Sequence, residues 1–512
     1  MADPEAQSTG TETQVETVEG KESLLDSILS KVEVGAPSEK VSVEDFKEKS
    51  AIADLDRGAM VSAALRVFID AVAEMEAPLE TIDKFLVDAL VAQIDKKISE
   101  QLDEVLHHEK FQKLESSWRG LKFLIDRTDF RKNVRIEMLN VSKETLQESF
   151  EETPELIQSA LYKHVYTNAY DQPGAYPYAA IISNYEFENT AADMELLRNV
   201  SKVSASAHCP FIGAIGPKFF GKKSMAEWKK IPDLTAYMET AEFIKWNSFR
   251  QTEDARYVGL AFPRYMSRLP YGPDTVKVKD FNYEENVKGP DHDKYLWGNA
   301  SFAFTSNMVR SFMRDGWCVQ IRGPEAGGKV ENLPVHNYDV GKGKQMKIPT
   351  EVPISETLEF ECSKLGFMPI SHYQGKDFAV FFSANSAQEP QLYDDNNATA
   401  NSRINARLPY IFLASRISHY LKVIQRENIG ATKDAAKIEK ELNDWLQLLV
   451  TELDDPRPEQ VAKYPLRGAK VQVKALDDNP GFFRVETAIM PHFQIEGMDI
   501  SLSLVGKMPR AE

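Results

Sequence analysis

The feature that most constrains this fold is an alternation of strand-like and helix-like segments between residues 134 and 387. Short apolar runs alternate with longer segments whose apolar residues recur every three or four positions, as in buried strands and amphipathic helices. The strand candidates are 134–141, 178–187, 210–216, 256–262, 317–323 and 377–384. The helix candidates are 154–170, 190–208 and 299–316. This order predicts an α+β fold with a mixed α/β body.

Composition divides the rest of the chain. The first residues are acidic and have almost nothing to bury, which predicts a disordered leader. A polar stretch at 388–400 marks a second boundary, after which two helical patterns precede a strand-rich end. The expected divisions are a leader (1–21), a short helix (22–35), a linker (36–58), an α/β body that begins with helices (59–387) and a C-terminal domain (388–512).

The short helix after the leader has one apolar stripe, and Ser23 stands where an N-cap belongs. The stripe consists of Leu24, Leu25, Ile28, Leu29 and Val32. An isolated helix of this length is marginally stable in water. We therefore expect it to dock in an apolar groove, either on its own domain or on another protein.

A basic stripe follows Pro409 in the C-terminal domain. Arg416, His419, Lys422 and Arg426 recur at helical spacing and should share one face of a helix. Two interpretations stay open for the stripe: a solvated face, or a surface directed at an acidic partner.

The chain ends in alternating strand patterns at 469–476, 482–490, 493–497 and 498–508. Their apolar positions include Val471, Val473, Ile500, Leu502 and Leu504. No helical pattern follows to cover the last strand. The sheet is therefore either completed within the chain, or its edge pairs with a strand of another chain.

Charge and cysteine usage exclude several classes of function. The net charge of −17 argues against binding to nucleic acid or to an anionic membrane surface. No apolar run approaches the roughly 20 residues of a membrane-spanning helix, and no secretory signal is visible. Cys209, Cys318 and Cys362 are odd in number and widely spaced, which indicates a reducing cytoplasm.

One segment resembles a phosphate-binding P-loop. Residues 323–329 are rich in glycine, end in Lys329 and follow a strand candidate, but Val330 stands where a Ser or Thr should hold Mg²⁺. Pro334 also argues against the helix that should follow. We interpret the segment as a surface loop.

Other reactive residue types form no catalytic pattern. We expect His107, His108 and Glu109 to be solvated, and Cys209 beside His208 to be a buried thiol. The sequence therefore predicts a protein that is not an enzyme and has no catalytic residue, metal or cofactor.

Several long segments carry a family resemblance. They are ESSWRGLKFLI (115–125), PFIGAIGPKFFG (210–221), FRQTEDARYVGLAFPRYMSRLPYG (249–272), WGNASFAF (297–304), RGPEAGGKVENLPVH (322–336) and LYDDNNATANSRINARLPY (392–410). In these segments the chain resembles the large subunit of the type VI secretion contractile sheath, the TssC/VipB family, over about residues 22–508.

The resemblance implies a structural role in the bacterial cytoplasm, without nucleic-acid binding or membrane insertion. The chain would pair with a small sheath subunit (TssB/VipA family). The heterodimers would stack with other heterodimers on a baseplate, around an inner tube (Hcp family), and contract to propel tube and spike. An AAA+ unfoldase (ClpV family) would then dismantle the contracted sheath.

The resemblance also assigns roles to residues. The stripe of Leu24, Leu25, Ile28, Leu29 and Val32 would bind the unfoldase. The C-terminal domain would face the tube, through Arg416, Lys422 and Arg426, and share strands with neighbouring subunits. Two alternatives remain: the sheath of a phage-tail-like contractile particle, and a P-loop nucleotide-binding enzyme that uses Lys329.

Overall fold

The computed structural model describes residues 84–492, apart from positions 280, 342, 452, 454–455 and 476–482. The chain divides into two compact units. Unit 1 comprises Met1–Gln112 and Tyr271–Asn286, and unit 2 comprises Lys113–Pro270 and Val287–Glu512. In unit 1 the structure describes α4 (Lys84–Leu106), the first residues of α5 (Glu109–Asp126) and the loop that returns at 271–286.

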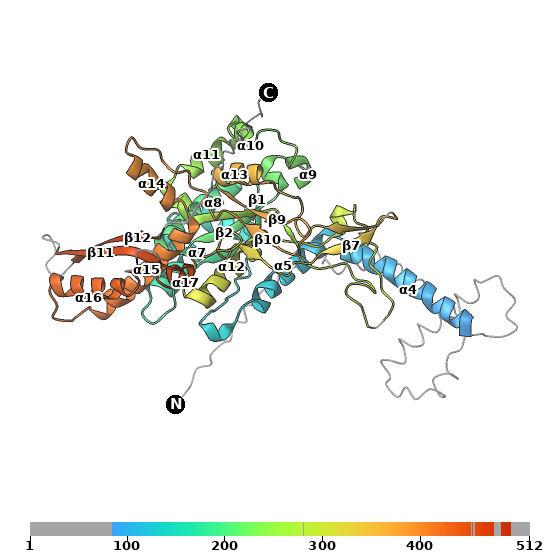
Figure 1. Ribbon diagram of the computed structural model, residues 1–512, viewed down its shortest axis with the longest axis horizontal. Coiled ribbons are helices and arrows are strands. Elements are labelled where there is room, and N and C mark those ends of the chain that lie inside the picture. Colours follow the sequence, from blue (N-terminus) through green and yellow to red (C-terminus); the bar gives the residue numbers. More distant parts are fainter. Residues whose placement is uncertain are drawn as a thin grey trace, which may run out of the picture. The chain divides into compact units, whose positions relative to one another are not determined.

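A six-stranded mixed sheet lies at the centre of unit 2 (Figure 1). Its strands, in spatial order, are β1 (Ile181–Phe187), β2 (Phe211–Ile215), β3 (Val258–Phe262), β9 (Phe367–His372), β10 (Ala379–Phe381) and β6 (Lys329–Val330). The first four strands are parallel, and β10 pairs antiparallel with both β9 and β6.

Helices cover both faces of this sheet because successive strand residues point to opposite sides. On one face, Phe211 and Leu260 pack with residues of α8 (Ala191–Ala207), α11 (Ile244–Arg250) and α13 (Glu356–Lys364). On the other face, Ile212 and Ala261 pack with residues of α12 (Ala300–Asp315) and α15 (Leu408–Glu427). The result is a three-layered α/β/α body, in which α8, α11 and α13 lie above the strands in Figure 1.

Phe367 of β9 lies at the centre of the first of these cores. Its ring stacks on Trp246 at a centroid distance of 5.1 Å, and Phe219, Phe220 and Phe262 surround it at 5.4, 5.6 and 5.9 Å. All five side chains are fully buried. This aromatic cluster holds the helical layer on β3 and β9.

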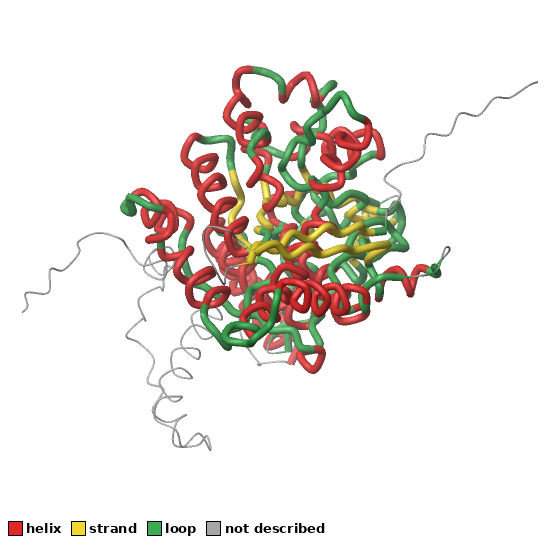
Figure 2. The backbone as a smooth tube through the Cα atoms, turned by 90° about the vertical axis from the view of Figure 1, so that its left-hand side faces the viewer, coloured by secondary structure: helices red, strands yellow, loops and turns green. Residues whose placement is uncertain are grey.

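A second core closes the C-terminal part of unit 2. The hairpin β11 (Leu466–Ala475) and β12 (Phe483–Pro491) packs with α16 (Ala435–Gln447) and the second half of α15. Figure 2 shows the two long strands of this hairpin beside the helices. The strands expected at 469–476 and 482–490 are confirmed as this hairpin.

The remaining elements are short. Ten of them precede β4 in the sequence: η1 (Phe130–Lys132), α6 (Lys143–Glu151), η2 (Leu156–Gln158), α7 (Ala160–Tyr162), the π-helix η3 (Lys163–Asp171), η4 (Pro217–Phe220), α9 (Met225–Trp228), α10 (Leu234–Met238), η5 (Ala241–Phe243) and η6 (Glu253–Tyr257). The others are β4 (Tyr265–Met266), η7 (His292–Lys294), β5 (Trp297–Gly298), β7 (His336–Asp339), β8 (Lys344–Lys347), α14 (Asn396–Asn405) and α17 (Pro458–Lys463).

The predicted mixed α/β class is confirmed, as are all three predicted helices and the strands β1, β2, β3 and β10. The strand predictions at 134–141 and 317–323 are wrong. The second of these segments alternates because Trp317, Val319 and Ile321 are all buried, but it runs as a loop without a strand partner. Alternation reports which side chains are buried, and it does not report backbone pairing.

The sequence also missed β9, the strand between β3 and β10. Pro369 lies within it, and proline is unusual in a central strand because it has no N–H to donate. The structure tolerates Pro369 because β10 pairs only with residues 370–372 and ends before it. The short strand β6 and the helix α13 were missed as well.

Candidate inter-subunit surface

The β11–β12 hairpin presents two different faces. Val471 and Val473 are buried against the C-terminal core, and Val485 and Ile489 are partly buried there. The alternate positions point away from this core, and they include three exposed basic residues and one acidic residue: Lys470, Lys474, Arg484 and Glu486. Arg467, at the register irregularity near the start of β11, is exposed as well. The outer face of the hairpin is therefore predominantly basic.

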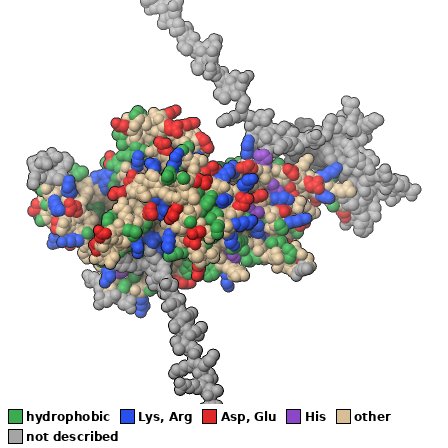
Figure 3. Space-filling model, turned by 90° about the horizontal axis from the view of Figure 1, so that it is seen from above, with side chains coloured by type: hydrophobic (Ala, Val, Ile, Leu, Met, Phe, Trp, Pro, Cys, Tyr) green, Lys and Arg blue, Asp and Glu red, His purple; other side chains and the backbone are tan. Residues whose placement is uncertain are grey.

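This local excess of positive charge contrasts with the mixed charges on the face seen in Figure 3. Across the face seen in Figure 3, Lys and Arg side chains are interspersed with Asp and Glu. Within the described part of the hairpin, one ion pair crosses the two strands, between Lys474 Nζ and Glu486 Oε2 at 2.8 Å.

The two edges of the hairpin also differ. In an antiparallel pair, opposed residues alternate between those that exchange backbone hydrogen bonds and those whose N–H and C=O point outward. The amide of Val471 donates to Asn443 Oδ1 at 2.9 Å, so the pair of Val471 with Thr487 belongs to the outward-pointing kind. By the same parity, the backbone groups of Phe483, Val485, Thr487 and Ile489 point to the outer edge of β12.

The inter-subunit role of Val471 and Val473 stays a prediction. Val471 and Val473 were expected in inter-subunit strands, but the structure pairs β11 with β12 on one side and with α16 side chains on the other. Among the described residues, the edge available to another chain is that of β12. Ile500, Leu502 and Leu504 lie outside the described residues.

The predicted basic stripe on α15 contacts the same chain. Lys422 Nζ lies 2.9 Å from Asp171 Oδ1, and Arg426 donates to the carbonyl oxygens of Tyr170, Asp171 and Gln172 at 3.1–3.3 Å. These carbonyls belong to the C-terminal end of η3, where helical carbonyls lack partners and the helix dipole is negative. Arg416 stacks on the ring of Tyr420 at 4.8 Å. The tube-facing role of the stripe stays a prediction, although Lys422 and Arg426 already have partners within the chain.

His419, the fourth member of the stripe, is buried and has almost no contact with solvent. Its Nε2 lies 2.9 Å from the carbonyl oxygen of Ala207 at the end of α8. Burial is the main cause that lowers the pKa of His419, and the neighbouring Arg416, His208 and Lys422 contribute in the same direction. The Ala207 carbonyl opposes them, and the net pKa is about 4. His419 is therefore neutral at neutral pH.

We expect acid to loosen α15 through His419. An unfolded histidine gains its proton near pH 6.5, whereas the folded one resists protonation down to about pH 4, so stability is full above pH 6.5 and falls between these values. The loss at pH 5 should be about 2 kcal/mol. The stability of α15 is tested by hydrogen exchange of its amides at pH 7.5 and pH 5, with each rate corrected for the intrinsic exchange rate at that pH. The variant His419→Asn should show a smaller pH effect, and an equal effect in both proteins would contradict the assignment.

The P-loop-like segment lacks the geometry for a phosphate. The loop is followed by the strand β6 and not by a helix. Asn307 and Arg310 donate to the carbonyl oxygens of Gly328 and Gly327 at 2.9 and 2.8 Å, and Lys329 Nζ lies 5.0 Å from the centre of the Phe378 ring. A phosphate site requires converging N–H groups at a helix N-terminus. This segment is instead a buttressed turn at the edge of the sheet.

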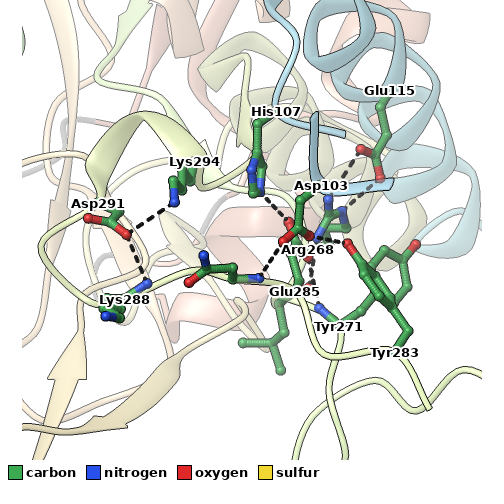
Figure 4. A network of polar contacts seen from close by, with 12 residues as sticks. Asp103, His107, Glu115, Arg268, Tyr271, Tyr283, Glu285, Lys288, Asp291 and Lys294 are labelled. Atoms are coloured by element: carbon green, nitrogen blue, oxygen red, sulfur yellow. Dashed lines mark hydrogen bonds and ion pairs between the residues drawn. The ribbon is translucent and has the colours of Figure 1, made fainter. Parts of the chain in front are cut away.

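His107, directly after α4, belongs to a polar cluster of unit 1, shown in Figure 4. His107 Nε2 lies 3.1 Å from Oε1 of the buried Glu285, and Tyr271 donates its backbone N–H to the other oxygen of that carboxylate at 2.9 Å. Asp103 accepts from the hydroxyl of Tyr283 at 2.6 Å. The expectation that His107 is solvated is therefore wrong, because the loop at 271–286 supplies partners from far along the sequence.

A separate ion pair of unit 2 is drawn in the same view. Arg268 Nε lies 2.8 Å from Glu115 Oε1 on α5, and both side chains are largely buried. Arg119 also contacts this carboxylate, at 2.6 Å. Sequence inspection gave no signal for this pairing, since 153 residues separate Arg268 from Glu115.

The cysteines show no sign of reactivity. Cys209 and Cys362 are fully buried, Cys318 is partly buried, and all three are free thiols. Burial raises the pKa of each thiol, that of Cys318 to about 12, so none is a thiolate at neutral pH. Within the described residues, no group of three or more His, Cys, Asp or Glu is placed to hold a metal ion, and no helix is long and apolar enough to cross a membrane.

Among the described residues, unit 2 has a sheet that is covered by helices on both faces, and a hairpin whose β12 edge has no hydrogen-bond partner. Comparison with known proteins gives the class: residues 88–388 match the family model "EvpB/VC_A0108, tail sheath N-terminal domain", and residues 397–508 match "EvpB/VC_A0108, tail sheath gpW/gp25-like domain". The chain belongs to this VipB family of tail sheath proteins.

A curated relative places the chain more closely. This chain is 40% identical to the type VI secretion system sheath protein TssC1 of Pseudomonas aeruginosa PAO1, and the match covers 83% of this chain and 86% of TssC1. The predicted resemblance is confirmed, and the chain is a large sheath subunit of the type VI secretion class.

Solved contractile particles are more distantly similar. The baseplate of the anti-feeding prophage matches with a TM-score of 0.35 and 11% identity, over 73% of this chain and 83% of that chain. The contracted sheath complex of the PVC extracellular contractile injection system matches with a TM-score of 0.33 and 9% identity, over 60% and 68%.

Proposed function

We propose that this chain forms a cytoplasmic contractile sheath with a small sheath subunit, around an inner tube and on a baseplate. The observation that carries the proposal is the open edge of β12, whose outward backbone groups suit the addition of a strand from a neighbouring subunit. Family membership supplies the sheath role.

An exposed apolar stripe supports the need for a partner. Leu114, Trp118 and Ile125 of α5 follow one another at helical spacing and are 49, 58 and 41% exposed. Large exposed apolar side chains in one stripe mark an interaction site, and tryptophan is the residue type most enriched at binding hot spots. This surface would be covered when the small subunit binds.

Contraction needs two packings of the same subunits. Alternative packings of one sequence differ by a few kcal/mol, so each subunit would store only a small amount of energy. Strands shared between neighbours would couple the subunits, so that release spreads along the sheath while the lattice stays connected. No nucleotide site is required for this step.

Co-expression with a small subunit tests the proposal. We expect hollow tubules by negative-stain microscopy when both subunits are present, and aggregation or poor solubility when this chain is made alone. A soluble, cooperatively unfolding monomer that forms no tubules with the small subunit would contradict a sheath role.

Residues 22–35, predicted as a short helix and outside the described residues, are the proposed binding site of an unfoldase. Leu25→Asp with Leu29→Asp should abolish binding, because burying an unpaired carboxylate in an apolar groove costs several kcal/mol and each 1.4 kcal/mol is about tenfold in affinity. The control Ser27→Asp with Ser30→Asp adds the same charge on the opposite side of the helical pattern. Pull-down by the unfoldase of assembled sheath measures the effect, and unchanged binding of the leucine variant would remove this site.

Recycling by an unfoldase also distinguishes a type VI secretion sheath from the alternative, the sheath of a phage-tail-like contractile particle. A reusable cytoplasmic machine benefits from a disassembly signal, whereas a phage-tail-like particle that fires once does not. Loss of unfoldase binding in the leucine variant alone would therefore favour the type VI system.

A further inference from the structure

The β11–β12 hairpin has two edges, and each edge of an isolated hairpin is a row of backbone donors and acceptors that can add a strand. In this structure the two edges differ in their hydrogen-bond partners. The β12 edge carries no hydrogen bond from any other described residue, whereas the β11 edge is occupied by side chains of α16.

Three side chains of α16 occupy the β11 edge. Asn443 both accepts from the amide of Val471 at 2.9 Å and donates to its carbonyl at 3.0 Å, as a paired strand residue would. Glu439 accepts from the amide of Val473 at 2.9 Å, and Gln447 donates to the carbonyl of Ala469 at 3.2 Å. Together they bond to every second residue along the outer edge of β11.

The spacing of these side chains matches the strand. Glu439, Asn443 and Gln447 are four residues apart, so they lie on one helical face with a rise of about 6 Å between them. Their partners are two residues apart on β11, which is about 6.8 Å along a strand. The order is reversed, so the helix runs antiparallel to β11 and its side chains imitate a neighbouring strand.

Packing keeps this row in place. Leu442 and Leu446 of α16 are fully buried in the same core as Val471, one residue before Asn443 and Gln447. The helix is therefore fixed against the hairpin, which keeps the row of Glu439, Asn443 and Gln447 beside the β11 edge.

We propose that α16 closes the β11 edge, so that strands of neighbouring subunits add to the hairpin only at β12. This inference rests on the proposed sheath function, in which strands are shared between subunits. A hairpin with two open edges could pair on either side and join sheath subunits in wrong registers or crosslink separate sheaths. One closed edge gives each subunit a single direction for strand exchange.

The test opens the closed edge in the heterodimer with the small subunit. The variant Glu439→Ala with Asn443→Ala removes both side chains that accept from β11 amides. Lys440→Ala is the matched control, since Lys440 is exposed on the same helix. A second variant, Asn443→Asp, keeps the acceptor for the Val471 amide and loses the donor to its carbonyl, so it tests the edge with the smallest change to the fold.

Hydrogen exchange at single-residue resolution measures the protection of the β11 amides, and it does not require the sheath to assemble. We expect the amides of Val471 and Val473 to exchange at least tenfold faster in the double variant, while the amide of Gln472, which faces β12, keeps its wild-type rate. In sedimentation, the double variant should self-associate beyond the heterodimer. By microscopy it should form bundled or irregular tubules, with Asn443→Asp intermediate and Lys440→Ala like wild type.

Two outcomes would overturn the inference: unchanged exchange at Val471 and Val473, or faster exchange with no self-association and regular tubules. If the wild-type heterodimer forms no tubules at all, the proposed function fails, and exchange and sedimentation still decide whether α16 closes the edge.

Discussion

Replacing Thr487 by proline is expected to abolish sheath assembly while leaving the heterodimer soluble. Thr487 lies opposite Val471 in a pair whose backbone groups point away from each other, so its N–H faces the open edge of β12. Proline removes this N–H and places its ring where a neighbouring strand would lie. Edge positions tolerate proline because no hydrogen bond of the ladder is lost.

Two neighbouring substitutions control this experiment. Thr487→Val keeps the N–H and should assemble like wild type. Glu486→Pro removes an N–H that faces Gln472 within the hairpin, so it should destabilise the hairpin itself. Tubules are counted by negative-stain microscopy after co-expression with the small subunit. Regular tubules at wild-type yield from Thr487→Pro would show that the β12 edge does not take part in assembly.

Phe367→Ala is expected to destabilise unit 2 by about 3–5 kcal/mol. The Phe367 ring is fully buried and contacts four other aromatic side chains, of which Trp246 stacks on it at 5.1 Å. Truncation to alanine loses the transfer free energy of the ring and leaves a cavity that the sheet and the helical layer cannot both close. Urea unfolding of the heterodimer, followed by tryptophan fluorescence, measures the loss.

Phe360→Ala is the matched control. Phe360 lies on α13, close to β9 in sequence, but is 54% exposed and carries only Lys364 over its ring at 4.2 Å. Its truncation should change the free energy of unfolding by less than about 1 kcal/mol. Similar losses for the two variants would contradict the assignment of Phe367 to the centre of the core.

Much of the fold could be predicted from the sequence, because side-chain patterns report burial directly. The short, continuous apolar run of β2 indicates a strand that is buried on both faces, and the apolar spacing of α8 and α12 indicates both the element type and the face that packs. The C-terminal hairpin follows from its alternation and turn residues. Several long segments in the same order as in the family also carry the sheath resemblance in the sequence itself.

Tertiary structure alone decided how these elements are joined and which surfaces stay open. Alternation at 317–323 arises from burial in a loop, and Pro369 hides a central strand because its missing N–H falls beyond the end of β10. Arg426 of the basic stripe caps η3, since carbonyls about 255 residues away in the sequence lie within its reach.

The hairpin shows most clearly which features the sequence determines and which depend on the packed chain. Its sequence determined two amphipathic strands and a buried face containing Val471 and Val473, but both edges of such a hairpin look alike in sequence. Asn443 closes one of them from a helix 28 residues upstream. The physical reason is that side-chain periodicity encodes which residues avoid water, whereas the partner of each backbone N–H and C=O depends on distances that only the packed chain sets.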